Sequence, residues 1–250
     1  MAFDFTGQTI LVTGASRGIG RELTKALIKA GAVVYGLARN KDLLDILQQE
    51  CGEHFKPIVV DVSDWDATRA AIEVLPVMDG LVNNAGVFPP GGSALQMSKD
   101  LIQMTFDVNV WAPINIIQIV GSKMVSAGKK GSIVNVSSIA GLKSVNHSMH
   151  YCLSKAAMDM VTRQFAAELG PSNIRVNSAN PTIVYTDMGN AVIGYLPDKG
   201  ATLLGHTPMG RYMETEDAVG PILYLLSDHS SMVTGTTNIV DGGLLCYTKA

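Results

Sequence analysis

The stretch TILVTGASRGIGREL, residues 9–23, joins a short apolar run to a helical pattern through a turn that contains three glycines. Gly14, Gly18 and Gly20 follow a Gly-x-x-x-Gly-x-Gly spacing. A pyrophosphate needs backbone that turns tightly and comes close, and a helix start offers it free N–H groups and the positive end of a dipole. The stretch therefore predicts a dinucleotide-binding α/β fold. Its alternative interpretation is a turn with a purely structural role.

The same alternation of apolar runs and helical patterns continues along the chain. Seven runs rich in Val and Ile predict strands: TILVTG, AVVYGLA, PIVVD, DGLVNN, GSIVNVSS, IRVNSAN and TNIV. Helices are predicted over residues 18–30, 41–50, 65–74, 99–127, 151–169 and 215–226. Strands without polar alternation are buried on both faces, which indicates a parallel sheet covered by helices. We expect a single α/β domain over residues 1–250, with a Rossmann-type, doubly wound parallel sheet of seven strands flanked by helices.

One segment, residues 188–213, interrupts this alternation with repeated glycine and proline. An insertion of this length in a compact domain is more often a functional loop than a connection. We expect a substrate-binding loop or lid, and the alternative is a surface excursion without a role.

Composition excludes several classes of function. Charged residues make up only 16% of the chain, below the usual ~25%, which favours an oligomer that hides part of its surface. The net charge of −3 has no block of like charges, whereas a nucleic-acid-binding protein should carry a basic stripe. We therefore expect small-molecule partners and no nucleic acid.

Cysteine usage and the chain start indicate a compartment. Cys51, Cys152 and Cys246 lie far apart and form no Cys-x-x-Cys pair, and the five histidines show no metal-ligand spacing. The start MAFDFTGQT lacks the basic head and apolar run of a signal peptide, and no apolar run approaches the ~18 residues of a membrane helix. We expect reduced thiols, no metal, no membrane span and a cytoplasmic location.

The end of the second predicted strand, YGLARN, distinguishes the two dinucleotides. NAD-preferring sites usually have an acidic residue there to bind the ribose 2′-hydroxyl. Here that position is Ala38, followed by Arg39, and Arg17 projects from the glycine-rich turn. Guanidinium groups bind a 2′-phosphate bidentately, so these residues predict NADPH. Asp42 is interpreted as an acid in the first turn of a helix, and Arg39 as a solvated strand end is the alternative.

A tyrosine and a lysine, Tyr151 and Lys155, occur four residues apart in a predicted helix. At that spacing the two side chains share a helix face. An ammonium roughly 5 Å from a phenol, at an effective dielectric of ~20, favours the phenolate by about 3 kcal/mol, or some two pKa units. Such a phenol is a better general acid near neutral pH, but the pair alone is also explained by packing and solubility.

Several ordered motifs together resemble the short-chain dehydrogenase/reductase family over nearly the whole chain. They are TGASRGIG, Asp61 in VDVSD, NNAG at 83–86, Asn109, Ser137–Ser138, Tyr151-x-x-x-Lys155, the NP of Pro181, and DGG at 241–243. DWDAT, NHS, AAMDM, AAELGP and NPTIVYTDMG, with Thr182 where most members have glycine, are most similar to the dicarbonyl and L-xylulose reductases and the tetrameric carbonyl reductases.

The resemblance assigns catalytic roles. It implies that Tyr151 donates a proton to the oxygen of a reduced carbonyl, that Lys155 makes the phenol more acidic and binds the nicotinamide ribose, and that Ser138 holds the substrate oxygen. Ser137 is the neighbouring alternative to Ser138. In the family the backbone carbonyl of Asn109 holds a water of a proton relay. Pro113 has no N–H to offer that carbonyl, so we expect the helix to bend there and the carbonyl to stay free; a simple kink is the alternative.

The resemblance also assigns ligand contacts. The cofactor contacts that it implies are Gly14, Ser16, Arg17, Gly18, Ile19, Gly20, Arg39, Asp61, Val62, Asn83, Ala85, Gly86, Tyr151, Lys155, Pro181, Val184 and Thr186. Substrate contacts are expected from Ser138, His147 and Tyr151, whereas His150 is expected to be exposed and inert. A role for Asp61 as a helix cap is compatible with cofactor binding.

The expected activity is NADPH-dependent reduction of L-xylulose to xylitol and of α-dicarbonyls such as diacetyl. The alternatives are a 3-oxoacyl, lipid or steroid ketone reductase, and a non-enzymatic dinucleotide-binding oligomer. The resemblance implies a homotetramer that pairs the helices at 99–127 and 151–169, with Ile116, Ile117, Met158 and Phe165 on the paired faces. The apolar tail LLCYTKA is a candidate cover for a neighbour's site.

Overall fold

The computed structural model describes residues 3–247 and contains one seven-stranded sheet in which every neighbouring pair is parallel. The strand order is β3-β2-β1-β4-β5-β6-β7. The strands are β1 Thr9–Thr13, β2 Val33–Ala38, β3 Phe55–Val59, β4 Gly80–Asn83, β5 Gly131–Val136, β6 Ile174–Pro181 and β7 Thr237–Val240. The order reverses between β1 and β4, and such a reversal opens a ligand-binding crevice beyond the carboxyl ends of the strands.

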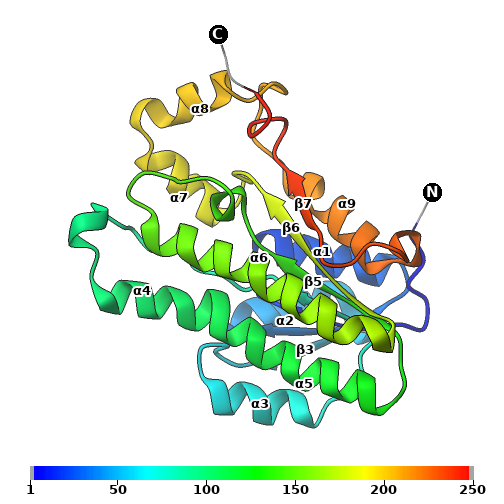
Figure 1. Cartoon of the computed structure of the whole chain (residues 1–250). Coiled ribbons are helices and arrows are strands. Elements are labelled where there is room, and N and C mark those ends of the chain that lie inside the picture. The colour runs from blue at the N-terminus through cyan, green and yellow to red at the C-terminus, as the bar shows by residue number, and fades with distance from the viewer. Residues whose placement is uncertain (1–2, 248–250) are drawn as a thin grey trace.

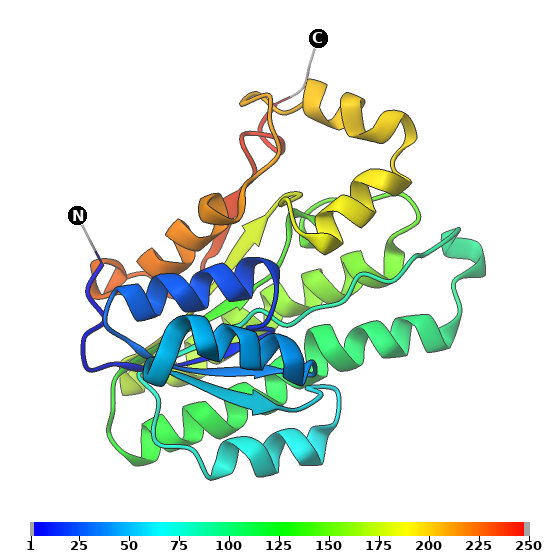
Figure 2. The same cartoon turned by 180° about the vertical axis from the view of Figure 1, so that it is seen from behind.

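Helices cover both faces of the sheet, as Figures 1 and 2 show. Their bounds are α1 Gly18–Lys29, α2 Lys41–Cys51, α3 Trp65–Glu73, α4 Lys99–Phe106, α5 Ala112–Ser126, α6 Met149–Leu169, α7 Asp187–Tyr195, α8 Ala201–Gly205 and α9 Thr215–Leu226. Helices α1, α2 and α9 pack on one face and α3 to α6 on the other. The doubly wound fold with seven parallel strands is confirmed.

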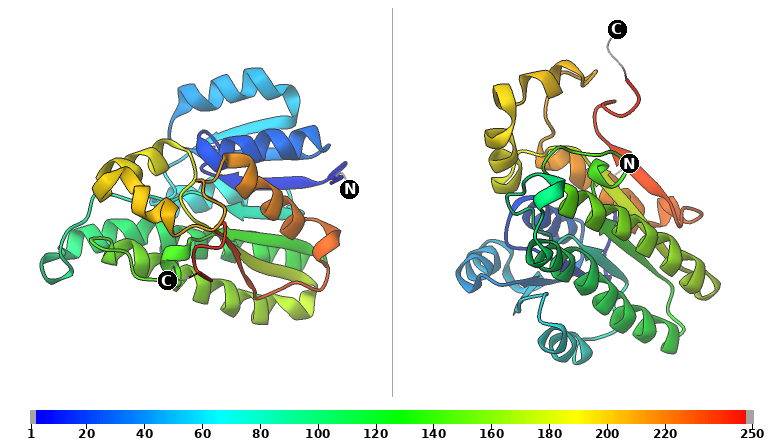
Figure 3. Two further views of the ribbon diagram at one scale, coloured as in Figure 1. Left: turned by 90° about the horizontal axis from the view of Figure 1, so that it is seen from above. Right: turned by 60° about the vertical axis from the view of Figure 1, so that its left-hand side comes forward.

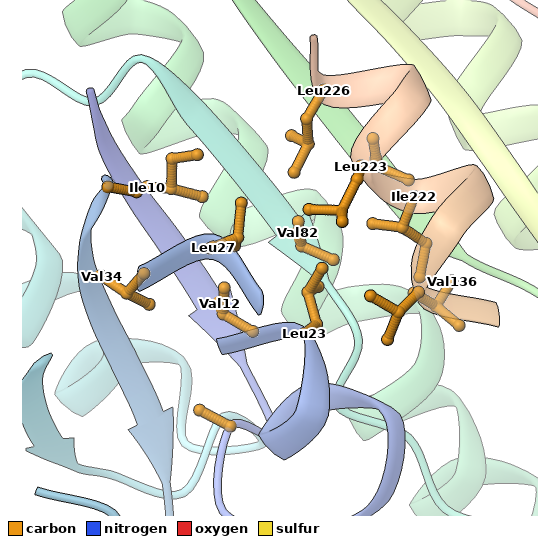
Figure 4. Packing of buried hydrophobic residues seen from close by; sticks show 14 of the residues in the cluster. Ile10, Val12, Leu23, Leu27, Val34, Val82, Val136, Ile222, Leu223 and Leu226 are labelled. Carbon is orange, nitrogen blue, oxygen red and sulfur yellow. The ribbon is translucent and has the colours of Figure 1, made fainter. Parts of the chain in front are cut away.

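The first face is built from side chains that recur at helical and strand spacing. Leu23 and Leu27 of α1 and Ile222 of α9 meet Val12 and Val82 of the sheet, and all five side chains are buried (Figure 4). Each Leu, Ile or Val buried in this way contributes roughly 1.5–3 kcal/mol by leaving water. This packing holds the start of α1, and with it the glycine-rich turn, against the edge of the crevice.

The segment that was expected to be a loop or lid, residues 188–213, begins with a helical hairpin that ends at Gly205 and continues without helix from 206 to 213. Most of α7, a 3₁₀ turn at Pro197–Gly200, and α8 stand beyond the carboxyl end of β6, apart from the main layers (Figures 1 and 3). The C-terminal segment lies next to this hairpin, since Met209 N–H donates to the carbonyl of Gly242. Its final residues, 248–250, which include the end of the expected tail, lie outside the described residues.

The region around Asn109, where a bend was expected because of Pro113, is a π turn. Residues Asp107–Trp111 have π geometry, and Ala112 N–H donates to the carbonyl of Asp107, five residues back. Proline cannot donate to the residue four positions earlier, and a local change to five-residue pairing accommodates that gap. Such π turns occur frequently at functional sites.

The side chains predicted to face a neighbouring subunit are mostly inside this chain. Ile116, Ile117 and Met158 are 0–2% exposed, and Phe165 packs against the core on the α5 face of the sheet. That expectation was wrong because a helix that covers a central parallel sheet buries more of its apolar side chains against the sheet than its sequence pattern indicates. No helix within residues 3–247 is both long enough and apolar enough to cross a membrane.

Candidate active site

A cleft of about 1350 Å³ lies at the carboxyl ends of the strands. The β1–α1 turn and the ends of β2 and β3 form one end of it, and α6, α7 and α8 line the other. The predicted cofactor or substrate residues that line it are Gly14, Ser16, Arg17, Gly18, Ile19, Arg39, Asp61, Val62, Ala85, Gly86, Ser138, His147, Tyr151, Lys155, Pro181, Val184 and Thr186. Gly20, Asn83 and Asn109 do not line it.

The glycine-rich turn is shaped by backbone that only glycine adopts readily. Gly14 and Gly18 have φ of +66° and +50°. Gly20 serves packing instead: a Cβ there would come within 2.3 Å of the Gly14 carbonyl oxygen and 2.4 Å of Asn84 Nδ2. This close approach between helix and turn explains the glycine, and its cofactor contact stays a prediction.

Of the two asparagines in the NNAG stretch, Asn84 lines the cleft and Asn83, the residue predicted to contact the cofactor, does not. Asn83 is 2% exposed, and its Nδ2 donates to Asn135 Oδ1 at 2.9 Å inside the sheet. Asn84 lines the cleft and donates to the carbonyls of Thr13 and Gly14 at 2.9 and 3.2 Å. Alternation along a strand puts successive side chains on opposite faces, which is the signal that could have separated these two asparagines.

The first turn of α1 is free to bind an anion. Helices α2, α3 and α4 each start with a side-chain cap, from Asn40, Asp64 and Ser98. Helix α1 has no side-chain cap and no acid in its first turn. Its leading N–H groups therefore keep their capacity to donate, and they lie where the cleft passes the turn.

Two arginines lie at the same end of the cleft. Arg39 Nη1 is 3.4 Å from Asp61 Oδ2, and Arg17 Nη1 is 3.6 Å from Asp187 Oδ2 at the start of α7. Both guanidiniums are more than half exposed. Ala38 ends β2 without a carboxylate, so this end of the cleft has exposed cations near the position where an NAD site usually has an acid.

At the other end, α6 presents Tyr151 and Lys155 to the cleft. Lys155 is 4% exposed, its Nζ donates to the Val136 carbonyl at 2.9 Å, and Nζ is 5.5 Å from the centroid of the Tyr151 ring. Burial raises the pKa of Tyr151 to about 12, with the Ser138 hydroxyl acting in the opposite direction. Burial also lowers the pKa of Lys155 to about 8, opposed by Asp159. In the protein alone the phenol is therefore less acidic than predicted, because burial disfavours the phenolate more strongly than its polar surroundings support it.

The two serines after β5 have different surroundings. Ser137 is 3% exposed, and its hydroxyl donates to the Lys155 carbonyl at 3.2 Å. The Ser138 hydroxyl is more accessible and lies beside Tyr151. Asn180 holds the Ser138 backbone, since its Nδ2 donates to the Ser138 carbonyl at 3.0 Å and to the buried carboxylate of Asp159. The geometry favours Ser138 over Ser137 as the group that meets a substrate.

The side chain of Asn109 is fully occupied in holding the loop after β4. Its Oδ1 accepts from Val87 N–H at 2.8 Å, and its Nδ2 donates to the Val87 carbonyl at 3.0 Å and to Ser154 Oγ at 3.1 Å. Any chemical role of Asn109 therefore falls on its backbone carbonyl, at the π turn.

The two histidines before the tyrosine differ from each other. His147 is exposed, lines the cleft and has φ of +60°. His150 is 0% exposed, and its Nε2 is 3.0 Å from the Pro89 carbonyl. The prediction that His150 is exposed was wrong, because the loop after β4 folds over the start of α6 and covers the ring.

Comparisons with known proteins agree with this geometry. The sequence profile of a family described as "Enoyl-(Acyl carrier protein) reductase" matches residues 14–245. An L-xylulose reductase of Caenorhabditis elegans is 46% identical, with 96% of this chain and 97% of that protein covered. The chain belongs to the short-chain dehydrogenase/reductase family.

Two further proteins show the same likeness over nearly the whole chain. A D-erythrulose reductase of Gallus gallus is 44% identical over 96% of this chain and 97% of its own length. A solved gluconate 5-dehydrogenase of Burkholderia cenocepacia, in complex with NADP and tartrate, has a TM-score of 0.91 at 28% identity and covers 99% of this chain and 98% of its own. Within residues 3–247, no three His, Cys, Asp or Glu side chains are grouped to hold a metal ion.

Proposed function

We propose that the protein uses NADPH to reduce the carbonyl of a small hydroxylated ketone, with L-xylulose and α-dicarbonyls such as diacetyl as substrates. The convergence of Tyr151, Lys155 and Ser138 at one end of the cleft carries this proposal. The uncapped start of α1 and the arginines Arg17 and Arg39 at the other end support a phosphorylated dinucleotide.

The relatives supply the substrate class. The Caenorhabditis elegans relative is named for L-xylulose and the Gallus gallus relative for D-erythrulose, which are both short ketoses. The substrate end of this cleft is lined by polar groups of the segment Lys143–Ser148 and by apolar groups of α7 and α8. A short chain with a ketone between hydroxylated carbons matches such a mixed wall.

Each of the three groups has a distinct task in the reduction. A nicotinamide bound in the cleft would supply the hydride for the carbonyl carbon. The Ser138 hydroxyl donates to the carbonyl oxygen, and Tyr151 gives its phenolic proton to that oxygen as negative charge develops there. Lys155 is charged at pH 7, since its pKa is about 8, and its charge favours the phenolate that Tyr151 leaves behind.

Burial keeps the proton on Tyr151 before the reaction. With a pKa of about 12, the phenol is protonated at neutral pH and ready to donate. Asp159 opposes the loss of the lysine proton, and its carboxylate is fixed by Asn180. We place the remaining predicted contacts, Ser16, Ile19, Asp61, Val62, Ala85, Gly86, Pro181, Val184 and Thr186, along the cofactor because all line the cleft.

A substrate panel tests the proposal. We expect NADPH oxidation with diacetyl and L-xylulose, and a loss of kcat of at least a thousandfold in Tyr151→Phe with folding and NADPH binding intact. Activity confined to 3-oxoacyl thioesters or steroids would favour the alternative reductases. Full activity of Tyr151→Phe, or NADPH binding without turnover of any carbonyl, would contradict the proposal and favour a non-enzymatic dinucleotide-binding protein.

We further propose a cytoplasmic homotetramer. Cys51, Cys152 and Cys246 are free thiols, which a reducing compartment preserves. Trp111 at the π turn and Leu153 and Met160 of α6 are about half exposed. These side chains offer an apolar surface for a second copy.

A further inference from the structure

The loop that follows β4 covers the first turn of α6 and brings an aromatic ring to the catalytic tyrosine. Phe88 meets the Tyr151 ring edge to face, with centroids 4.7 Å apart, and stacks on His150 with centroids 6.0 Å apart. Phe88 also lines the cleft. One ring thus forms part of the substrate wall and contacts the proton donor.

The loop is anchored on both sides of Phe88. On one side, the Asn109 side chain makes two hydrogen bonds to the Val87 backbone. On the other, His150 bonds to the Pro89 carbonyl at 3.0 Å. Neither Pro89 nor Pro90 has an N–H, so the backbone of these two residues can form hydrogen bonds only through its carbonyl oxygens.

A histidine at position 150 is poorly explained by stability alone. A carbonyl oxygen only accepts, so Nε2 must carry the proton, and the neutral ring then has a bare Nδ1. That Nδ1 is buried and has no hydrogen-bond partner within residues 3–247. A buried polar atom without a partner is destabilising, and an apolar ring of the same shape would avoid that cost. The donor at Nε2 is therefore what the histidine provides.

A second contact holds the same two segments together. A Cβ at Gly91 would lie 2.0 Å from the His147 carbonyl oxygen and 2.8 Å from His150 Cε1. His147 itself has φ of +60°, a conformation that is unfavourable for most residues other than glycine. The loop and the segment before α6 are thus packed backbone to backbone where both line the cleft.

From these contacts we propose that His150 is a positioning residue, which fixes Phe88 against Tyr151 through its hydrogen bond to Pro89. The proposal rests on the proposed function, since it assigns Tyr151 the proton transfer. His150 acts through Phe88 and touches neither substrate nor cofactor. Losing the bond to Pro89 frees the loop between Pro89 and Gly91, and Phe88 no longer holds the Tyr151 ring in place. The phenol then spends less time in the geometry for proton transfer. The adenosine end of the cleft is unaffected.

The test compares two substitutions at one position in the full-length protein. His150→Phe keeps a flat ring against Phe88 but removes the donor, and His150→Gln returns an amide N–H near Nε2. With diacetyl and NADPH, we expect kcat to fall at least tenfold in His150→Phe and to recover within threefold of wild type in His150→Gln. The Kd of NADPH should stay within twofold in both. His54→Gln, an exposed histidine after α2, is the matched control and should leave kcat unchanged.

A double-mutant cycle shows whether Phe88 carries the effect. We expect Phe88→Leu to lower kcat about tenfold, and adding His150→Phe to it to cost less than a further threefold, because coupled residues are not additive. A kcat of His150→Phe within twofold of wild type, equal losses in His150→Phe and His150→Gln, or full additivity would overturn the proposal. If His150→Phe fails to fold, the kcat of Phe88→Leu tests the proposal by itself. A wild-type kcat in Phe88→Leu would then overturn the proposal.

The two proposals fail in different ways. Loss of activity in Tyr151→Phe together with normal activity in His150→Phe would leave the reductase assignment intact and remove only the role of His150. Normal activity in Tyr151→Phe would remove both.

Discussion

Lys155 is a buried cation, and burial opposes its charge more strongly than its neighbours support it. Its pKa of about 8 lies well below the ordinary value near 10.5. The unfolded chain therefore holds more protons than the folded protein between pH 8 and 10.5, so this group destabilises the fold fully below pH 8. The destabilisation is relieved as pH rises from 8 to 10.5. The residue is thus placed for chemistry at a cost in stability.

A neutral residue at position 155 separates these two effects. We expect Lys155→Met to lose at least a thousandfold in kcat and to gain about 2–3 kcal/mol in unfolding free energy at pH 7, because the charge is no longer buried. Denaturant unfolding at pH 7 and pH 10 measures this, and the gain should shrink at pH 10. Lys130→Met, at an exposed lysine paired with Asp228, is the control. A less stable Lys155→Met protein at pH 7 would contradict this account.

The same pKa sets an alkaline limit for reduction. Tyr151 stays protonated up to about pH 12, so it does not limit the rate in the usual range. Lys155 loses its charge as pH rises through about 8, and the developing phenolate then loses its nearest cation. We expect kcat/KM for diacetyl to be flat below pH 7 and to fall above about pH 8. In Lys155→Arg the fall of kcat/KM above pH 8 should disappear, whatever the absolute rate of the variant, since arginine stays charged.

Arg39, at the end of β2, is the residue that we propose decides between the two dinucleotides. Arg39→Asp places a second carboxylate beside Asp61, which would repel a 2′-phosphate and accept the 2′-hydroxyl of NADH. We expect the ratio of kcat/KM for NADPH over NADH to fall at least a hundredfold. Lys56→Asp, an exposed change of the same charge on β3, should leave the ratio unaltered. An unchanged ratio in Arg39→Asp would assign the 2′-phosphate to another residue.

At the scale of the element, α4 and α5 form one long helix that is interrupted by the π turn around Asn109. Pro113 withholds an N–H, the π turn at Asp107–Trp111 takes up the mismatch, and the Asn109 side chain holds the loop after β4. Helix α9 also contains a proline, Pro221, away from the cleft and without a π turn. A proline alone therefore does not explain the geometry, and its position beside Asn109 is what matters.

Restoring the N–H at position 113 tests this. We expect Pro113→Ala to lower kcat about tenfold, because the new donor competes for the Asn109 carbonyl, and to leave the Kd of NADPH within twofold. Pro221→Ala is the matched control and should keep kcat within twofold. Equal effects of both substitutions would assign Pro113 to helix geometry only.

At the scale of the molecule, helices α5 and α6 have apolar side chains of two kinds, some buried in the core of the chain and others exposed on its surface. Ile116 and Ile117 serve the core, whereas Leu153 and Met160 of α6 remain about half exposed. A chain with only 16% charged residues that leaves such side chains open is typical of a subunit.

Light scattering on purified protein measures the proposed assembly. We expect a tetramer for wild type and smaller species for Leu153→Glu combined with Met160→Glu, because buried unpaired carboxylates oppose association. Val74→Glu, at an exposed apolar residue after α3, should remain tetrameric. A monomeric wild-type protein would exclude this assembly.

The sequence by itself determined the repeating strands and helices, the glycine-rich turn and the Tyr151–Lys155 pair, because periodicity and spacing act locally along the chain. All seven strands occur where the apolar runs predicted them. Only the tertiary structure decided that His150 is buried under the loop after β4, and that burial dominates the pKa of Tyr151. These properties arise from contacts between segments tens of residues apart, and no local pattern encodes how closely such segments pack.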